Sequence, residues 1–186
     1  ESLARVEVIP KEIVVLADQP FIFFARSFGT SGGPLLNTEY VWRIEDPSVG
    51  TIDEAGRFQA ASMPGRYNNA VRVEAVQREN GVANKQTAYA TVTVAGEARV
   101  EPIVRVDVFP KEITLSADQP FVFNALSYDA FGSPVPVVKY EWDVSTSNIG
   151  TINDIGFFRA ADVPGKHEDA IRVKARQTVD GREVTK

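Results

Sequence analysis

The sequence predicts an all-β chain built as two tandem β-sandwich domains of one kind. Residues 5–86 align with residues 105–186 without a gap, and 34 of the 82 aligned positions are identical. Such a period indicates tandem duplication. Within each copy, apolar residues alternate with polar ones over short runs, and no segment keeps a period of 3.6 residues. Half-buried strands are therefore favoured over helices.

The strands of the first copy follow from these runs in order. The alternating positions are Val6 and Val8, Phe21 to Ala25, Tyr40 to Ile44, Val71 to Ala75, and a closing run of Ala88, Ala90, Val92 and Val94. Turn signals separate them at Pro10, Gly32-Gly33-Pro34, Asp46-Pro47, Gly56, Pro64-Gly65 and Asn80-Gly81. Short strands with one apolar face are best satisfied by two sheets packed face to face.

Each copy has one tryptophan on a middle strand, Trp42 in "YVWRIE" and Trp142 in "YEWDVS". The alternation predicts that the ring fills the centre of the sandwich while Arg43 or Asp143 faces water. The alternative is an exposed platform that stacks on a sugar or a base.

The phrase "GTIDEAGRFQA" at Gly50 returns as "GTINDIGFFRA" at Gly150. We expect a hairpin corner in which Asp53 or Asn153 caps the turn and a glycine takes a conformation awkward for other residues. Calcium is the alternative at Asp53, Glu54 and Asp154, but they supply fewer than the six to eight oxygens that calcium needs.

The order VxVxP, FxFxA, a mid-domain Trp, GTIDxxGxFxA, PG and VRVxA resembles bacterial immunoglobulin-like domains of the invasin and intimin kind. The resemblance covers nearly the whole chain. It implies immunoglobulin-like sandwiches, found among repeats of extracellular or envelope proteins and serving as stalks or adhesive modules. The fold carries no activity by itself.

We expect a first domain at residues 1–97, a short linker at 98–104 that Pro102 stiffens, and a second domain at 105–186. Since Lys186 aligns with Gln86, the second copy lacks its last strand in this chain. Truncation, a continuation beyond Lys186 and strand donation by another molecule all explain this.

Composition excludes several classes of protein. The 186 residues carry a net charge of −5 and no Cys, and Lys and Arg are scattered, so a nucleic-acid partner and a disulfide framework are not expected. There is no transmembrane run, and the start lacks Met and a signal segment. We read the chain as a piece of a longer protein. Its resemblance to the bacterial immunoglobulin-like domains implies a location in the extracellular space or the cell envelope.

No catalytic residue and no cofactor are expected. The single histidine, His167, replaces Tyr67 of the first copy, which resembles the tyrosine corner of immunoglobulin-type domains. The acids Glu12, Asp18, Glu39 and Asp46 are read as a solvated face rather than a glycosidase pair, and "GTSGGP" lacks the lysine of a phosphate loop. An isopeptide bond between Lys11 and Asn84 is conceivable, but Val184 replaces the asparagine in the second copy.

Two kinds of binding site remain open. Acids near the junction suggest an interdomain calcium clamp, with solvated charge as the alternative; they are Glu12, Asp18, Glu97, Glu101, Glu112 and Asp118. Aromatic or apolar residues present only in the second copy suggest a contact surface, with packing inside the molecule as the alternative; the candidates are Tyr128, Phe131 and Phe157, with Val138 against Thr38.

Three functions compete. The first is a non-enzymatic spacer repeat of a bacterial cell-surface or secreted protein, adjoining similar repeats of the same parent chain and able to self-associate. The second is an adhesive module for a glycan or a receptor protein. The third is an accessory domain of a polysaccharide-active enzyme. Exposure and clustering of Tyr128, Phe131 and Phe157 would favour the second.

Overall fold

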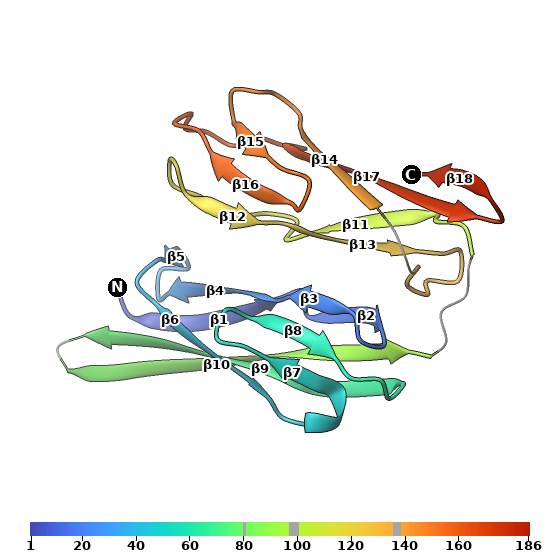
Figure 1. Cartoon of the computed structure of the whole chain (residues 1–186). Helices are drawn as coiled ribbons and strands as arrows, with labels where there is room; N and C mark the ends of the chain where they lie inside the picture. Colours follow the sequence, from blue (N-terminus) through green and yellow to red (C-terminus); the bar gives the residue numbers. More distant parts are fainter. Residues whose placement is uncertain (80, 97–100, 136–138) are drawn as a thin grey trace. The chain divides into compact units, whose positions relative to one another are not determined.

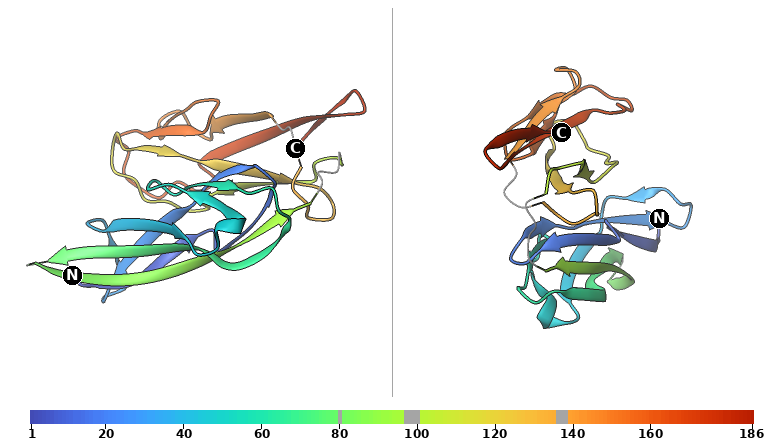
Figure 2. Two further views of the ribbon diagram at one scale, coloured as in Figure 1. Left: turned by 60° about the horizontal axis from the view of Figure 1, so that its bottom comes forward. Right: turned by 90° about the vertical axis from the view of Figure 1, so that its right-hand side faces the viewer.

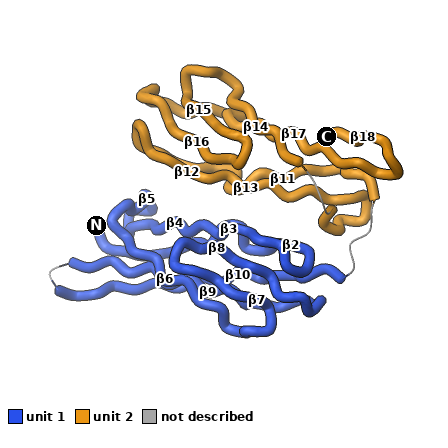
Figure 3. The backbone as a smooth tube through the Cα atoms, viewed as in Figure 1, with its two compact units in different colours: residues 1–97 blue, residues 98–186 orange. Residues whose placement is uncertain are grey.

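The computed structural model of the chain is all-β, as the sequence predicts (Figure 1). The structure describes residues 1–79, 81–96, 101–135 and 139–186. Within these ranges the one helical element is a short 3₁₀ turn, Pro47–Val49. The chain divides into two compact units, Glu1–Glu97 and Ala98–Lys186 (Figure 3).

The described residues of the first unit form ten strands in three sheets. The strands are β1 (Leu3–Ile9), β2 (Glu12–Leu16), β3 (Pro20–Ile22), β4 (Phe24–Gly29), β5 (Pro34–Leu35), β6 (Glu39–Ile44), β7 (Gly50–Ile52), β8 (Arg57–Ala60), β9 (Gly65–Glu79) and β10 (Val82–Ala95). The sheet orders are β1-β4-β5, β3-β8-β7 and β2-β10-β9-β6. The views in Figures 1 and 2 show β9 and β10 side by side as one long hairpin.

The connectivity is that of an immunoglobulin-like sandwich. The strands β3 and β4 are one line of chain interrupted at Phe23, so the first two sheets form one layer and the β2-β10-β9-β6 sheet forms the other. The chain changes layer between β1 and β2. As a result β2 pairs in parallel with the last strand, from Thr91↔Glu12 to Ala95↔Leu16.

The core lies between the two layers and is built by alternate residues of each strand. Phe23 and Phe58 are each 1% exposed and meet edge to face, with ring centroids 5.8 Å apart. Val71 and Val73 of β9 face them from the other layer and are fully buried. Such pairs add specific geometry to the hydrophobic gain of burial.

The second unit repeats this plan with fewer strands. They are β11 (Arg105–Phe109), β12 (Pro120–Val122), β13 (Asn124–Tyr128), β14 (Lys139–Val144), β15 (Gly150–Ile152), β16 (Phe157–Ala160), β17 (Ile171–Val179) and β18 (Arg182–Thr185). The sheets are β11-β13, β12-β16-β15 and β14-β17-β18. Residues 112–116, which correspond to β2, are not a strand. β18 matches the first part of β10.

The repeated phrase forms the predicted turn in both units. Asp53 Oδ1 accepts hydrogen bonds from the backbone N of Ala55 and of Arg57, both at 2.9 Å. Gly56 has φ of 77°, and its carbonyl accepts the N–H of Phe23 at 2.9 Å, which bridges the gap between β3 and β4. Asn153, Gly156 and Phe123 repeat these roles. The turn interpretation is therefore confirmed, and it explains why the phrase occurs twice.

The two tryptophans lie beneath this turn. A Cβ placed on Gly56 would stand 3.1 Å from Cε2 of Trp42, and one on Gly156 would stand 3.2 Å from Cε2 of Trp142. The Trp42 ring packs 6.4 Å from Phe23, centroid to centroid. Both tryptophans are half-buried rather than fully buried, so they seal the sandwich beside the turn and do not occupy its centre.

Candidate interaction surfaces

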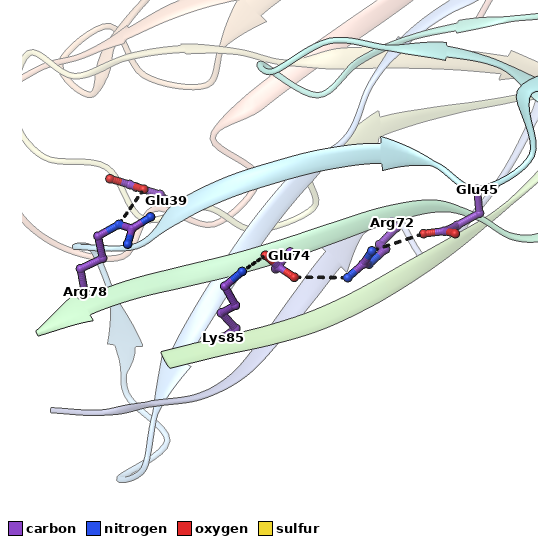
Figure 4. Close-up of polar contacts among 6 residues, drawn as sticks. All are labelled: Glu39, Glu45, Arg72, Glu74, Arg78 and Lys85. Atoms are coloured by element: carbon purple, nitrogen blue, oxygen red, sulfur yellow. Dashed lines mark hydrogen bonds and ion pairs between the residues drawn. The ribbon is translucent and has the colours of Figure 1, made fainter. Parts of the chain in front are cut away.

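The outer face of β6, β9 and β10 carries a chain of opposite charges (Figure 4). Glu74 lies between Lys85, whose Nζ is 2.8 Å from Oε1, and Arg72, whose Nη2 is 3.2 Å from Oε2. Arg72 Nη1 also reaches Glu45 at 3.7 Å, and Arg78 pairs with Glu39 at 3.8 Å. Cross-strand pairs of opposite charge stabilise the sheet face on which they lie.

The acidic groups of this face are paired with basic residues of the same face. The hydrogen bond from Lys85, followed by the charges of Lys85 and Arg72, holds the pKa of Glu74 below its usual value. The Arg78–Glu39 pair is largely exposed, and exposed pairs contribute little to stability. We therefore interpret the face as a solvated surface on which Glu39, Glu45 and Glu74 each have a basic partner.

The corresponding face of the second unit also carries ion pairs, but between other residues. Arg176 Nε lies 2.8 Å from Glu141 and its Nη1 lies 2.7 Å from Glu183. In the first unit, the residue at the position of Arg176 is the buried apolar Val76. Both copies thus carry ion pairs on this face, but the pairs are made by different residues.

The candidate calcium ligands that the structure describes have local contacts within their own units. Over the described part of the chain, no three His, Asp or Glu side chains are grouped so as to hold a metal. Glu12 pairs instead with Arg66 at 3.0 Å, and Asp18 and Asp118 occupy turns with φ of 58° and 57°. Glu97 lies outside the described residues, so the interdomain clamp stays a prediction.

The three aromatic candidates differ in exposure. Tyr128 is 4% exposed, and Arg105 lies over its ring with the guanidinium carbon 4.5 Å from the centroid, as Arg5 lies over Phe28 in the first unit. Burial, followed by the charge of Asp107, raises the pKa of Tyr128 to about 12. Tyr128 is therefore a core residue of its unit and presents no exposed ring.

Phe131 is 75% exposed, and Phe157 is half-buried on β16, a strand of another sheet. The turn that carries Phe131 is fixed by Asp129, which is 4% exposed and whose Oδ1 accepts the N–H of Phe131 at 2.8 Å and of Ser133 at 2.9 Å. A single exposed aromatic on a firm turn is a small feature for a binding surface. Val138, the fourth second-copy candidate, lies outside the described residues.

The histidine makes the contact that the tyrosine corner predicts. Tyr67 donates its hydroxyl proton to the carbonyl of Met63 at 3.0 Å, and His167 Nε2 lies 3.3 Å from the carbonyl of Val163. The role of both residues is to brace the chain four residues upstream. This supports the structural interpretation of His167 over a catalytic one.

Lys11 and Asn84 do not approach one another in the manner of an isopeptide pair. Asn84 Nδ2 donates to Ser2 Oγ at 2.9 Å and to the carbonyl of Leu3 at 2.8 Å, while Lys11 is exposed. Asn84 thereby fastens the first strand to β10. This supports the interpretation of both as ordinary structural residues.

A repeated buried glutamine was missed at the level of sequence. Gln77 is 3% exposed; its Oε1 accepts the N–H of Leu3 and its Nε2 donates to the carbonyl of Glu1, both at 2.7 Å. Gln177 does the same for Ile103 and Glu101, at 3.2 and 3.0 Å. The glutamine fastens the chain where it enters each unit. The signal available in the sequence was that the same polar residue stands at positions 77 and 177, each time within a strand of alternating apolar residues.

Glu101 and Ile103 therefore belong physically to the second unit, although they stand within the expected linker of residues 98–104. Ile103 is 4% exposed and forms a small core with Val135 and Ala175. The division between the units at Glu97 and Ala98 falls where the sequence repeat places the end of the first domain.

Comparison with known proteins gives likeness in structure only. No protein-family model matches the chain, and no curated protein matches it. The S-layer protein SbsC is similar over 99% of this chain and 28% of its own, at 15% identity and a TM-score of 0.38. The three N-terminal domains of the outer capsid protein Hoc of bacteriophage RB49 match at 16% identity and a TM-score of 0.33, over 97% of this chain and 65% of theirs.

Drosophila N-cadherin domains EC1–4 match at 13% identity and a TM-score of 0.33, over 95% of this chain and 46% of theirs. The chain thus spans less than a third of the SbsC chain and about half of the cadherin chain. At such identities and scores, these likenesses are no basis for assigning a function.

No helix in the described ranges has the length and apolar character needed to cross a membrane.

Proposed function

We propose that the chain is a non-enzymatic spacer repeat of a bacterial cell-surface or secreted protein, of the kind that its resemblance to invasin and intimin domains implies. The observation that carries the proposal is the parallel pairing of β2 with β10. In that pair, a strand close to the start of the unit lies beside the strand that ends it.

This pairing suits a unit that is pulled by its ends. The chain enters the first unit beside Gln77 and Asn84, where Leu3 is bound, and leaves it at Ala95, which pairs with Leu16. Tension on the two ends draws β2 and β10 in opposite directions along their lengths. All the ladder hydrogen bonds between them are then loaded together, because neither strand can be peeled from one end.

Internal contacts that recur in both units also support the spacer role. The Gly56 turn, the Tyr67 corner and the Gln77 contact recur in the second copy, whereas the charges on the outer sheet face do not. Duplication of internal contacts without duplication of a chemical surface is what a spacer requires. An adhesive role would rest on Phe131 as the exposed member of the three aromatic candidates.

The test is single-molecule force spectroscopy of the chain held by its ends, with two substitutions at one position. Thr91 N donates to Lys11 O, and Thr93 pairs with Val14, so the parallel ladder directs the N–H of Val15 toward β10. Val15→Pro removes that donor, while Val15→Ala shortens the same buried side chain and keeps it.

We expect Val15→Pro to lower the unfolding force of the first unit well below that of Val15→Ala. The two forces are compared under conditions in which the two variants have the same thermal stability. Equal unfolding forces for the two variants would show that the β2–β10 pair does not resist tension and would overturn the mechanical part of the proposal. Turnover of a substrate by the unmodified chain would overturn its non-enzymatic part.

A further inference from the structure

The strand β6 lies at the edge of its sheet. In the order β2-β10-β9-β6 it pairs with β9 on one side, and Figure 4 shows Glu39 at the start of β6. The register between β6 and β9 runs from Glu39↔Val76 to Ile44↔Val71 without a bulge. The strand also contains no proline. Bulges and prolines are two common devices that block an edge strand, and β6 has neither.

The backbone groups of β6 alternate between β9 and the sheet edge. The N–H of Glu45, just after the strand, donates to the carbonyl of Ala70 at 2.8 Å. Because hydrogen-bonded and non-hydrogen-bonded pairs alternate along an antiparallel ladder, the odd-numbered residues of β6 direct their backbone groups toward β9. Tyr40 and Trp42 direct theirs toward the edge, where a further strand can bind them.

β6 is accessible on both of its faces. Its outward-facing side chains are exposed, with Val41 at 38%, and its inward-facing side chains, which include Tyr40 and Trp42, are half-buried. At the other edge of the same sheet, Ile13 and Val15 of β2 are 3% and 0% exposed. The β6 edge is thus less covered than the β2 edge, and a strand added to β6 would bury aromatic surface.

The outward-facing side chains of β6 are complementary to a second copy of themselves. They are Glu39, Val41 and Arg43, an apolar residue between two opposite charges. When two copies of β6 run antiparallel with Val41 opposite Val41, Glu39 of each copy stands opposite Arg43 of the other. In this register the edge-directed backbone of Tyr40 in each copy forms a hydrogen-bonded pair with Trp42 of the other.

A shift of the register removes this match. Moving one strand by two residues keeps the edge-directed backbone groups aligned, since their period is two. In one direction the shift places Arg43 opposite Val41 and Glu39 opposite Glu45, and in the other it places Glu39 opposite Val41. Both shifts lose the two ion pairs, so the side chains favour the register centred on Val41.

The corresponding strand of the second unit lacks this complementarity. β14 carries Lys139, Glu141 and Asp143 at the three outward-facing positions. In the same register, two copies of β14 would place Glu141 opposite Glu141. A pair of β6 with β14 would place Glu39 opposite Asp143 and Arg43 opposite Lys139. Like charges directly opposite each other are destabilising, so this register selects a first unit as the partner of a first unit.

We propose that the first units of two copies of this chain associate through their β6 edges, antiparallel and centred on Val41. The pairing joins two four-stranded sheets into one continuous sheet. It closes after two copies, because both copies use the same edge. The contact is short, so we expect a weak dimer with a dissociation constant of about 0.1–1 mM. The inference does not depend on the spacer role.

The test is sedimentation equilibrium of the chain from about 10 μM to about 1 mM, with charge variants of β6. Glu39→Arg and Arg43→Glu each place like charges opposite each other in the dimer. Each variant alone should therefore associate at least about tenfold more weakly than the unmodified chain. A mixture of the two variants restores both ion pairs and should associate as the unmodified chain does. Asp143→Lys, at the position that corresponds to Arg43 in the second unit, is the matched control and should have no effect.

Amide hydrogen exchange at low and high concentration locates the contact. The N–H groups of Tyr40 and Trp42 should gain protection as the concentration rises. The N–H of Val41, which is directed toward β9, should change little. Because Glu39 and Arg43 are exposed, both single variants should keep the melting temperature of the first unit, which separates lost association from unfolding.

A chain that stays monomeric at about 1 mM would overturn the proposal. Undiminished association of both single variants would also overturn it, because the opposed charges would then not matter. A mixture of the two variants that fails to associate would refute the antiparallel register. Growth beyond a dimer, or association lost in Asp143→Lys, would assign the contact to another surface and refute the β6 edge.

Discussion

The substitution Gly56→Ala tests the interpretation of the repeated phrase most sharply. Gly56 has φ of 77°, and a Cβ there would stand 2.5 Å from the carbonyl oxygen of Phe23 and 3.1 Å from the Trp42 ring. Left-handed backbone costs a non-glycine residue about 1–2 kcal/mol. Forcing an extra group into a packed site costs about 1–3 kcal/mol more, for a total of about 2–5 kcal/mol.

Gly81→Ala separates these two costs. Gly81 has φ of 81°, but a Cβ there would meet nothing within 4 Å. The control should therefore lose only the backbone cost of about 1–2 kcal/mol. The difference between the two variants measures the close approach of the turn to the Phe23 carbonyl.

The assay is urea unfolding followed by tryptophan fluorescence in a Trp142→Phe background, so that Trp42 reports the first unit alone. A loss of about 2–5 kcal/mol lowers the urea midpoint by about 1–3 M for a domain of this size. If Gly56→Ala and Gly81→Ala were equally destabilising, the turn would not be held against the sandwich, and the account of the repeat would be wrong.

Three other predictions concern Tyr128, Tyr67 and Phe131. Burial raises the pKa of Tyr128 from 10.0 to about 12, so between these pH values the second unit binds more protons when folded than when unfolded. Its free energy of unfolding should therefore fall by about 2–3 kcal/mol as the pH rises from about 10 to 12. Unfolding measured across this pH range should show a smaller fall in Tyr128→Phe. Tyr67→Phe loses the hydroxyl bond to Met63 and should cost the first unit about 0.5–1.5 kcal/mol in urea unfolding; no loss would refute the corner. Phe131→Ser, which installs the residue of the first copy, should leave thermal stability unchanged. It should reduce the binding of a glycan or a receptor protein only if Phe131 belongs to an adhesive surface.

The calcium question has an equally direct check. Sites in extracellular modules bind calcium with dissociation constants of about 0.1–1 mM. If the acids near the junction are solvated charge, millimolar calcium should change neither the melting of the two units nor the scattering profile of the chain. A calcium-dependent change that is absent from the double variant Glu101→Gln and Glu112→Gln would instead support the interdomain calcium site.

Much of the fold follows from sequence because local signals and the repeat agree. The alternation around Val71 and Val73, the Asp53 turn and the Tyr67 corner each have a short-range cause, and each occurs where it was expected. The layer change between β1 and β2 depends on pairing with β10, about 80 residues later, and no local pattern indicates it.

The side-chain roles were harder to predict for the same reason. Tyr128 has the sequence context of a strand end, and only tertiary packing buries it beneath Arg105. Gln77 resembles a surface residue until the entering chain covers it. Trp42 is half-buried because the turn at Gly56 covers one side of its ring.

The central claim is that a unit of this chain resists tension through the parallel β2–β10 pair. It is tested most directly by pulling the unmodified chain by its ends and comparing its two unfolding events. Within the described residues, the first unit has the parallel pair and the second does not. The account predicts two events at clearly different forces, with the stronger assigned to the first unit by its contour length of about 97 residues. Two events at the same force, or a stronger second unit, would contradict it.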